Sequence, residues 1–87
     1  MGAPVAATAD GMVGSAGWMG GYGLTVEVDH GSAIQTRYAH LSAMAVSPGQ
    51  SVKQGQIIGF VGSTGRSTGP HLHYEVRVAE VAIDPLP

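Results

Sequence analysis

The sequence contains no cysteine, so neither a disulfide nor a thiolate metal site can form. Charged residues make up only 11% of the 87 residues and the formal net charge is −2, which argues against nucleic acid or an anionic membrane as a partner. No apolar run approaches the roughly 20 residues of a membrane-spanning helix, so membrane insertion is not expected. The opening residues also lack the basic and apolar regions of a targeting signal. These absences leave one small globular domain as the class to expect.

Fourteen glycines separate short runs rich in β-branched residues, and this pattern predicts an all-β fold. Strands are expected at 4–9, 12–18, 24–30, 33–40, 57–61, 71–78 and 81–83, with a short extended piece at 52–53. Gly31-Ser32 predicts a hairpin turn and Pro48-Gly49 a type II turn. At most one helical turn is expected, within 42–46. The predicted architecture is a compact antiparallel barrel-sandwich with a β-sheet groove, forming a single domain over residues 1–87.

Three further patterns predict how the strands are placed. The strand at 24–30 alternates cleanly, with its aliphatic residues directed inward. The run at 57–61 is apolar on both faces, which is typical of a centrally buried strand. Asp10 and Asp29 lie next to turns, where hydrogen bonds from the side chain to the backbone would account for them.

The strand at 71–78 carries the most informative pattern. Alternation directs His71, His73, Glu75 and Arg77 to one face. The apolar residues between them, Leu72, Tyr74, Val76 and Val78, would then face a core. Two histidines separated by one residue lie roughly 6–7 Å apart on a strand, from a rise of about 3.3 Å per residue. They could share a metal ion or a reacting group, although paired surface histidines also occur by chance.

The other polar residues have two interpretations each. His40 ends its strand, as surface or capping histidines do, but it is also a candidate functional residue. His30 shares the inward parity of its strand, which favours a hydrogen-bonded histidine at the margin of the core. Glu75 could accept a hydrogen bond from the imidazole of His73 and so orient that ring. A salt bridge with Arg77 on the same face is the interpretation that we favour.

Three motifs in order resemble those of the lysostaphin-like (LytM-type) zinc metalloendopeptidases, which hydrolyse the peptides of bacterial cell-wall peptidoglycan. They are Tyr38-Ala39-His40-Leu41, the segment PGQSVKQGQIIG at 48–59 and the segment GSTGRSTGPHLHYE at 62–75. The resemblance extends from about Gly2 to Pro87. It implies an antiparallel β-sheet groove, a zinc cofactor and a peptidoglycan peptide as the partner. It also implies a parent protein that is secreted or located in the bacterial cell envelope.

The resemblance also implies roles for the histidines. In that family the zinc is held by a His-x-x-x-Asp motif and by the second histidine of His-x-His, which is His73 here. The matching positions of the other two histidines, His40 and His71, act beside the metal on the attacking water and the developing oxyanion. The polar loop at 63–69 would form one lip of the groove.

One departure from the family pattern bears on activity. The His-x-x-x-Asp motif, normally found before the strand that begins Gly2-Ala3-Pro4-Val5, is absent from this sequence. Catalytic zinc sites use three protein ligands, so we expect an N-terminally truncated core that binds zinc poorly and is weakly active or inactive. The alternative is a makeshift site of His40, His71 and His73. Loss of the preceding segment could also expose a sheet edge and favour self-association.

Two other functions fit parts of the pattern. A non-catalytic regulator or cell-wall-binding module could use the same groove, although retention of all three histidines favours an enzyme. A lipoyl- or biotin-carrier domain would explain the hairpin at 48–59. Such domains present a modified lysine at the hairpin tip, whereas Lys53 is expected in a hairpin arm.

Overall fold

The computed structural model describes residues 2–62, 72–78 and 81–83, the last three without their side chains. In this part of the chain, eight strands form one antiparallel sheet. The strands are β1 (Pro4–Ala6), β2 (Gly11–Trp18), β3 (Leu24–Gly31), β4 (Ile34–Met44), β5 (Ser51–Val52), β6 (Ile57–Val61), β7 (His73–Val78) and β8 (Val81–Ile83). A 3-10 turn, η1 (Gly20–Tyr22), joins β2 to β3. Among the residues described, no helix has the length and hydropathy needed to span a membrane.

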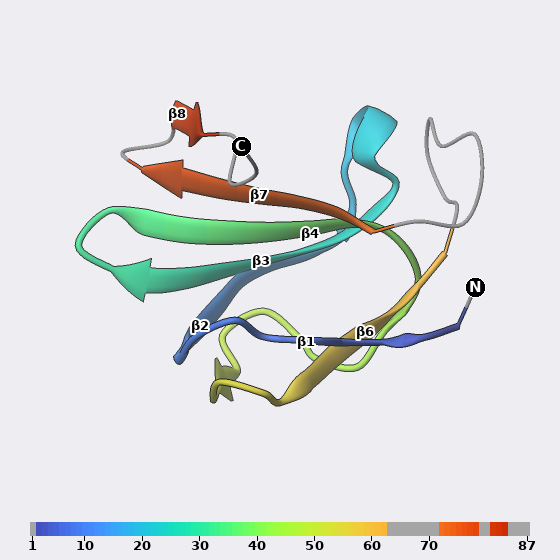
Figure 1. The fold of residues 1–87 in the computed structure, drawn as a ribbon, viewed down its shortest axis with the longest axis horizontal. Coiled ribbons are helices and arrows are strands. Elements are labelled where there is room, and N and C mark those ends of the chain that lie inside the picture. The colour runs from blue at the N-terminus through green and yellow to red at the C-terminus, as the bar shows by residue number, and fades with distance from the viewer. Residues whose placement is uncertain (1, 63–71, 79–80, 84–87) are drawn as a thin grey trace.

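The sheet is organised around β4, the longest strand (Figure 1). Residues 34–39 of β4 pair with β7, and residues 41–44 pair with β6. The opposite edge of β4 pairs with β3. The strand order is therefore β1-β6-β4-β3-β2-β5, with β7 and β8 branching from β4. This curled antiparallel sheet confirms the predicted all-β fold.

The change of partner along β4 occurs at His40. The pairing with β3 shifts register between Leu24 and Val26, where the partners change from Leu41 to Tyr38. This shift inserts one extra residue into β4, which is a β-bulge. His40 lies inside the bulge and has a φ of 60°. The bulge breaks the alternation of β4, so that residues 38–41 are all buried.

The hairpin between β3 and β4 has a two-residue loop, because Gly31 pairs with Ile34. Its two central residues are Ser32 and Ala33, with φ angles of 53° and 63°. Positive φ at both positions defines a type I′ turn, which normally contains asparagine and glycine. The turn therefore lies one residue later than the predicted Gly31-Ser32.

Two turns with the same geometry flank β5, at 47–50 and 53–56. In each, the third residue is a glycine with a φ of 85°, Gly49 in the first and Gly55 in the second. The backbone N–H of the fourth residue donates to the carbonyl of the first, at 3.1 and 2.9 Å. The fourth residue is glutamine in both turns, and its side-chain oxygen accepts from the first N–H at 3.2 and 3.0 Å. The first turn confirms the type II turn predicted at Pro48-Gly49.

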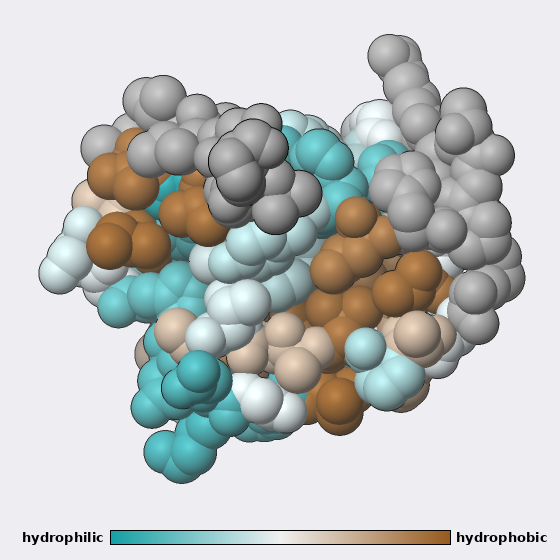
Figure 2. Space-filling model, viewed as in Figure 1, coloured by the Kyte–Doolittle hydropathy of each residue, from teal (hydrophilic) through white to brown (hydrophobic). Residues whose placement is uncertain are grey.

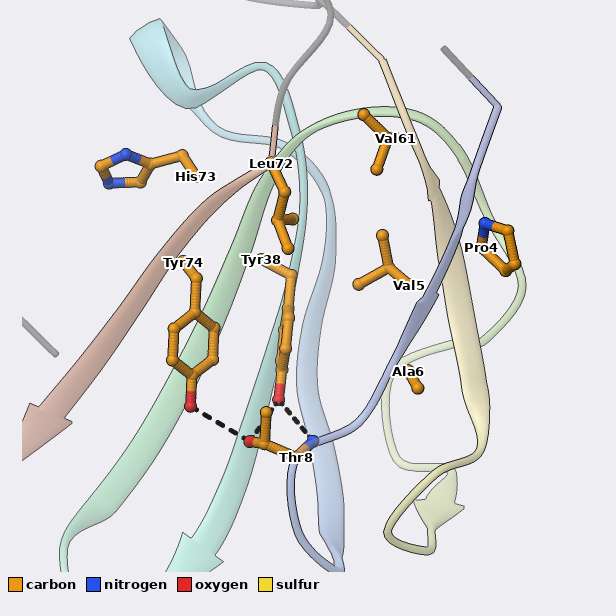
Figure 3. Close-up of a pocket in the computed structure, with 9 residues that line it drawn as sticks. All are labelled: Pro4, Val5, Ala6, Thr8, Tyr38, Val61, Leu72, His73 and Tyr74. Atoms are coloured by element: carbon orange, nitrogen blue, oxygen red, sulfur yellow. Dashed lines mark hydrogen bonds between the residues drawn. The ribbon is translucent and has the colours of Figure 1, made fainter. Parts of the chain in front are cut away.

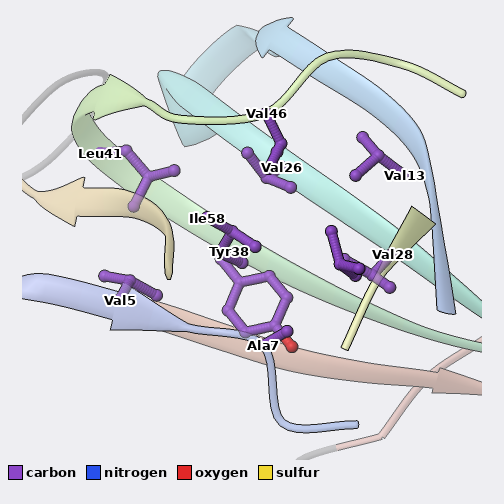
Figure 4. Close-up of a cluster of buried hydrophobic side chains, with 10 residues drawn as sticks. Val5, Ala7, Val13, Val26, Val28, Tyr38, Leu41, Val46 and Ile58 are labelled. Atoms are coloured by element: carbon purple, nitrogen blue, oxygen red, sulfur yellow. The ribbon is translucent and has the colours of Figure 1, made fainter. Parts of the chain in front are cut away.

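The core lies on the inner face of the curled sheet, with Tyr38 at its centre (Figure 4). Its members are Val5, Ala7, Val13, Val26, Val28, Tyr38, Leu41, Val46, Val52 and Ile58. They come from β1 to β6 and from the segments between them. Tyr74 of β7 packs against this cluster while remaining partly exposed. The inward orientation predicted for the aliphatic residues of β3 is therefore confirmed.

Other expectations about burial and strand length were wrong. Ile57 is 41% exposed, while its neighbour Ile58 is fully buried, so β6 has one buried face rather than two. Leu72 and Val78 are each 38% exposed although they share the parity of Tyr74. A single curled sheet provides only one inner face, which explains the exposure of Ile57. Leu72 lies just before β7 and Val78 ends it, and both lie outside the core cluster. Residues 42–44 continue β4 instead of forming a helical turn, because β6 supplies their backbone partners.

The two aspartates at turns behave as predicted. Asp29 accepts a hydrogen bond from the backbone N–H of Gly31 at 2.8 Å. Asp10 accepts one from the backbone N–H of Gln54 at 2.7 Å, across 44 residues of sequence. Both carboxylates therefore fix chain reversals rather than contribute to a site.

Candidate active site

Two of the predicted histidines meet on β4 and β7. His73 lies opposite Ala39 in the register between these strands, which places it beside His40. The centroids of the two imidazole rings are 5.8 Å apart, in an edge-on arrangement. Together with Gly21 and Tyr22 of η1, the rings line a hollow of about 250 Å³. Sequence segments around positions 21, 40 and 73 therefore converge on one site.

The bulge in β4 explains why His40 reaches this hollow. Without it, His40 would share the side of Tyr38, which belongs to the core. A non-glycine residue with positive φ is disfavoured, and such residues concentrate at functional sites. His40 is only 7% exposed, so its ring is held within the structure rather than projecting into solvent.

Glu75 is the hub of the polar contacts around His73. Its Oε2 accepts hydrogen bonds from His73 Nε2 and from the Tyr22 hydroxyl, both at 2.8 Å. Its Oε1 accepts from Arg77 at 3.0 Å and lies 3.9 Å from the guanidinium of Arg37. The two alternatives weighed for Glu75 are therefore both correct, one at each oxygen. Burial acts to raise the pKa of Glu75, but the hydrogen bonds from His73, Tyr22 and Arg77 outweigh burial and hold the pKa below its ordinary value.

Arg37 connects this hub to the middle of the sheet. It donates two hydrogen bonds to Glu27, at 2.7 and 3.0 Å, and its guanidinium lies 4.9 Å from the ring centroid of Tyr22. Burial acts to lower the pKa of Arg37, and the contacts with Glu27, Tyr22 and Glu75 together raise it above its ordinary value. Arg37 is therefore a fixed positive charge beneath the aromatic ring that borders the hollow.

A second, larger hollow of about 560 Å³ opens between β1 and β7 (Figure 3). Its lining residues are Pro4, Val5, Ala6, Thr8, Tyr38, Val61, Leu72, His73 and Tyr74. The hydroxyls of Tyr38 and Tyr74 both meet the Thr8 hydroxyl, at 3.0 and 3.1 Å. Figure 3 shows the His73 ring on the other side of β7 from Leu72, so the two hollows lie on opposite sides of this strand. The surface view shows a largely apolar area over β1 and β6 (Figure 2).

His30 has the structural role favoured by its parity. Its Nδ1 lies 2.7 Å from the backbone carbonyl of Asp10 and its Nε2 lies 2.7 Å from the hydroxyl of Thr36. Both ring nitrogens thus have partners at the margin of the core. This interpretation of His30 is confirmed.

The remaining predicted site residue, His71, lies outside the described residues, as does the loop at 63–69. Its convergence with His40 and His73 stays a prediction. The sequence pattern gave no indication of a role for Tyr22, which lies between the strands expected at 12–18 and 24–30. The only signal is an aromatic residue inside a glycine-rich segment, and this does not indicate where the ring lies.

The side chains present are compatible with zinc as far as they are described. A carboxylate on Nε2 of His73 leaves Nδ1 for a metal, the arrangement in which metal-binding histidines are commonly held. Within residues 2–62, 72–78 and 81–83, no group of three histidine or acidic side chains could hold a metal ion. Three protein ligands are needed for a catalytic zinc. His73 therefore fits one of these positions, and the described residues do not supply the other two.

Several relatives of this chain are named as peptidoglycan endopeptidases. The model of peptidase family M23 matches residues 1–85. The DD-carboxypeptidase/endopeptidase Mpg of Neisseria meningitidis serogroup B is 52% identical over 85 residues, which cover 98% of this chain and 20% of Mpg. The murein hydrolase activator EnvC of Escherichia coli is 42% identical over 86 residues, 99% of this chain and 20% of EnvC. The chain thus spans about a fifth of the length of these relatives.

Solved structures share the fold. The catalytic domain of lysostaphin from Staphylococcus simulans superimposes with a TM-score of 0.92 at 41% identity, covering 98% of this chain and 68% of that domain. A zinc-containing peptidase from Vibrio cholerae gives a TM-score of 0.91 at 46% identity, covering 95% of this chain and 26% of the peptidase. The sequence matches and the shared fold establish that the chain belongs to peptidase family M23.

Proposed function

We propose that this chain is the core of a zinc metalloendopeptidase that hydrolyses peptide bonds of peptidoglycan in the bacterial cell envelope. The observation that carries the proposal is the pair of imidazoles, His40 and His73, edge-on to each other at 5.8 Å in the lining of one hollow, with the carboxylate of Glu75 bonded to His73. Membership of family M23 and the DD-endopeptidase activity named for Mpg support the same substrate class.

Each histidine has a role in this proposal. His73 provides one metal ligand through Nδ1, because Glu75 occupies Nε2. His40, fixed by the bulge in β4, and His71, by family resemblance, accept and return protons beside the metal. Neutral imidazoles suit this task because their ordinary pKa of about 6.5 lies near the working pH. A bound zinc ion would supply Lewis-acid activation of water and of the scissile carbonyl.

Zinc binding and cell-wall hydrolysis test the proposal together. We expect calorimetric titration to show weak zinc binding that is lost in a His73→Ala variant, and weak clearing of purified cell walls that a chelator abolishes. A His40→Ala variant should retain zinc while losing clearing. His30→Gln is the matched control, since His30 bonds to Asp10 and Thr36 rather than to the paired imidazoles. Clearing that survives chelation, or zinc binding that survives loss of His73, would refute the assignment.

A second candidate is a non-catalytic regulator of cell-wall hydrolysis. The likeness to EnvC, named as a murein hydrolase activator, is the observation that favours it. Co-sedimentation with purified cell walls, without clearing at saturating zinc, would support this second function over the first.

A further inference from the structure

We infer that Glu75 and Tyr22 form a clamp that positions His73, fixing both the orientation of its ring and which of its nitrogens carries the proton. This inference deepens the proposed function by naming the residues that prepare the metal-binding nitrogen. Both are positioning residues, since they act through His73 rather than on a substrate. Nothing in the family resemblance assigned a role to Tyr22.

The proton position follows from the partners of Oε2. Glu75 accepts hydrogen bonds from Tyr22 and Arg77 and faces the guanidinium groups of Arg77 and Arg37, so it is an ionised carboxylate that only accepts hydrogen bonds. His73 Nε2, 2.8 Å away, must therefore carry a proton. In a neutral imidazole the other nitrogen then keeps its lone pair. Nδ1 of His73 is thus prepared to bind a cation before any cation arrives.

The carboxylate itself is fixed by a row of charges across three strands. Glu27 on β3 lies opposite Arg37 on β4, and Arg37 lies opposite Glu75 on β7. Arg37 bonds to Glu27 at 2.7 Å and comes within 3.9 Å of Glu75. The side chains of all three are between 13% and 17% exposed, so solvent screens them less than it screens surface pairs. Glu75 therefore has little freedom to leave His73.

Tyr22 contacts both Glu75 and His73 and forms the second part of the clamp. Its hydroxyl donates to the same Oε2 that His73 uses, and its ring centroid lies 5.6 Å from that of His73. Arg37 packs against the same ring at 4.9 Å. Tyr22 belongs to η1, so one hydrogen bond attaches the β2–β3 connection to β7. The hollow beside His40 therefore has a wall that depends on this bond.

The expected effect is large enough to measure. Removing a hydrogen-bond partner of a metal-binding histidine typically lowers metal affinity by about 10–100-fold. We expect Glu75→Ala to lose zinc affinity by that factor. Tyr22→Phe keeps the ring against His73 and Arg37 and removes one hydroxyl, so a loss of about two- to tenfold is expected. The matched control is Asp29→Asn, which alters a carboxylate that bonds to the backbone of Gly31 and contacts neither His73 nor the row of charges, and little change is expected.

Nitrogen NMR of the zinc-free chain provides a readout that does not depend on the metal. At a pH above about 8, where an ordinary imidazole is neutral, His73 should show a protonated Nε2 and an unprotonated Nδ1 as a single form. Glu75→Ala should give averaged signals from both forms. Averaged signals or a protonated Nδ1 in the unmutated chain would overturn the inference, even if the variant fails to fold. Unchanged zinc affinity in Tyr22→Phe would overturn the part assigned to Tyr22.

The two measurements separate this inference from the proposed function. If the unmutated chain binds no zinc, the proposed function fails for this chain, while the nitrogen signals still decide whether Glu75 positions His73. If zinc binds but the nitrogen signals are averaged, the positioning inference fails and the proposed function stands.

Discussion

The hairpin between β3 and β4 offers a direct test of the backbone geometry. Ala33 has a φ of 63°, and its side chain is exposed. The left-handed region costs an L-residue about 1–2 kcal/mol, whereas glycine enters it without that penalty. Ala33→Gly should therefore relieve strain without removing any packing.

The magnitude follows from two opposing effects. Relief of the left-handed conformation at Ala33 contributes about 1–2 kcal/mol, and the greater freedom of glycine in the unfolded chain subtracts about 0.5–1 kcal/mol. Taking the middle of each range, the net gain is about 0.75 kcal/mol. For a domain of this length, 1 kcal/mol shifts Tm by roughly 4–8 °C, so a rise of about 3–6 °C is expected.

A matched control lies on the strand that follows. Ala43 is also exposed, but it lies within β4, opposite Phe60. Ala43→Gly makes the same chemical change in an extended backbone and should lower stability by about 0.5–1 kcal/mol. Thermal unfolding followed by circular dichroism, with urea titration to confirm an unchanged m value, compares the two variants. Equal effects, or a lower Tm for Ala33→Gly, would refute the assigned turn.

Three further predictions concern the core, a close backbone approach and acid. Ile58→Ala removes a fully buried side chain and should lower the free energy of unfolding, measured in urea, by about 2–5 kcal/mol. Ile57→Ala, at a position that is 41% exposed, should lower it by less than about 1 kcal/mol. Similar losses for the two variants would contradict the core described. Gly62→Ala places a Cβ 2.5 Å from a backbone nitrogen and should abolish soluble expression, whereas Gly14→Ala, with 3.8 Å of clearance, should be tolerated. Because the folded pKa of Glu75 is lowered, its contribution is complete above the unfolded pKa of about 4.3 and lost as pH falls through the folded value. Glu75→Gln should therefore flatten the acid limb of stability against pH in the zinc-free chain, and an unchanged limb would count against the lowered pKa.

Much of the fold follows from local signals in the sequence. Alternation located β3 and the inward side of its aliphatic residues, and Pro48-Gly49 located a type II turn. The type I′ turn was misplaced because Ser32 and Ala33 are not residues that favour positive φ. Burial of β6 was overestimated because a run of apolar residues does not reveal whether a second layer covers the outer face. Ile57 shows that here it is exposed.

The site was predictable in its residue types but not in its connections. His40 and His73 were identified by motif, and the structure places their rings together. The row of Glu27, Arg37 and Glu75 was not foreseen. An uninterrupted hairpin would place Glu27 opposite Tyr38, and a bulge near the end of β3 shifts the register by one residue to Arg37. Bulges have no reliable sequence signature, so such a network appears only in three dimensions.

The branching of the sheet at β4 has a consequence for how the site assembles. β2, β3 and β4 follow one another along the chain and can form from contacts that are close in sequence. β7 joins β4 only after a long intervening segment has been closed, which costs more chain entropy. Tyr22 and His40 therefore belong to the part that can form early, while His73 and Glu75 arrive with the late strand. Detachment of β7 alone would separate His73 from His40 while leaving β2, β3 and β4 paired.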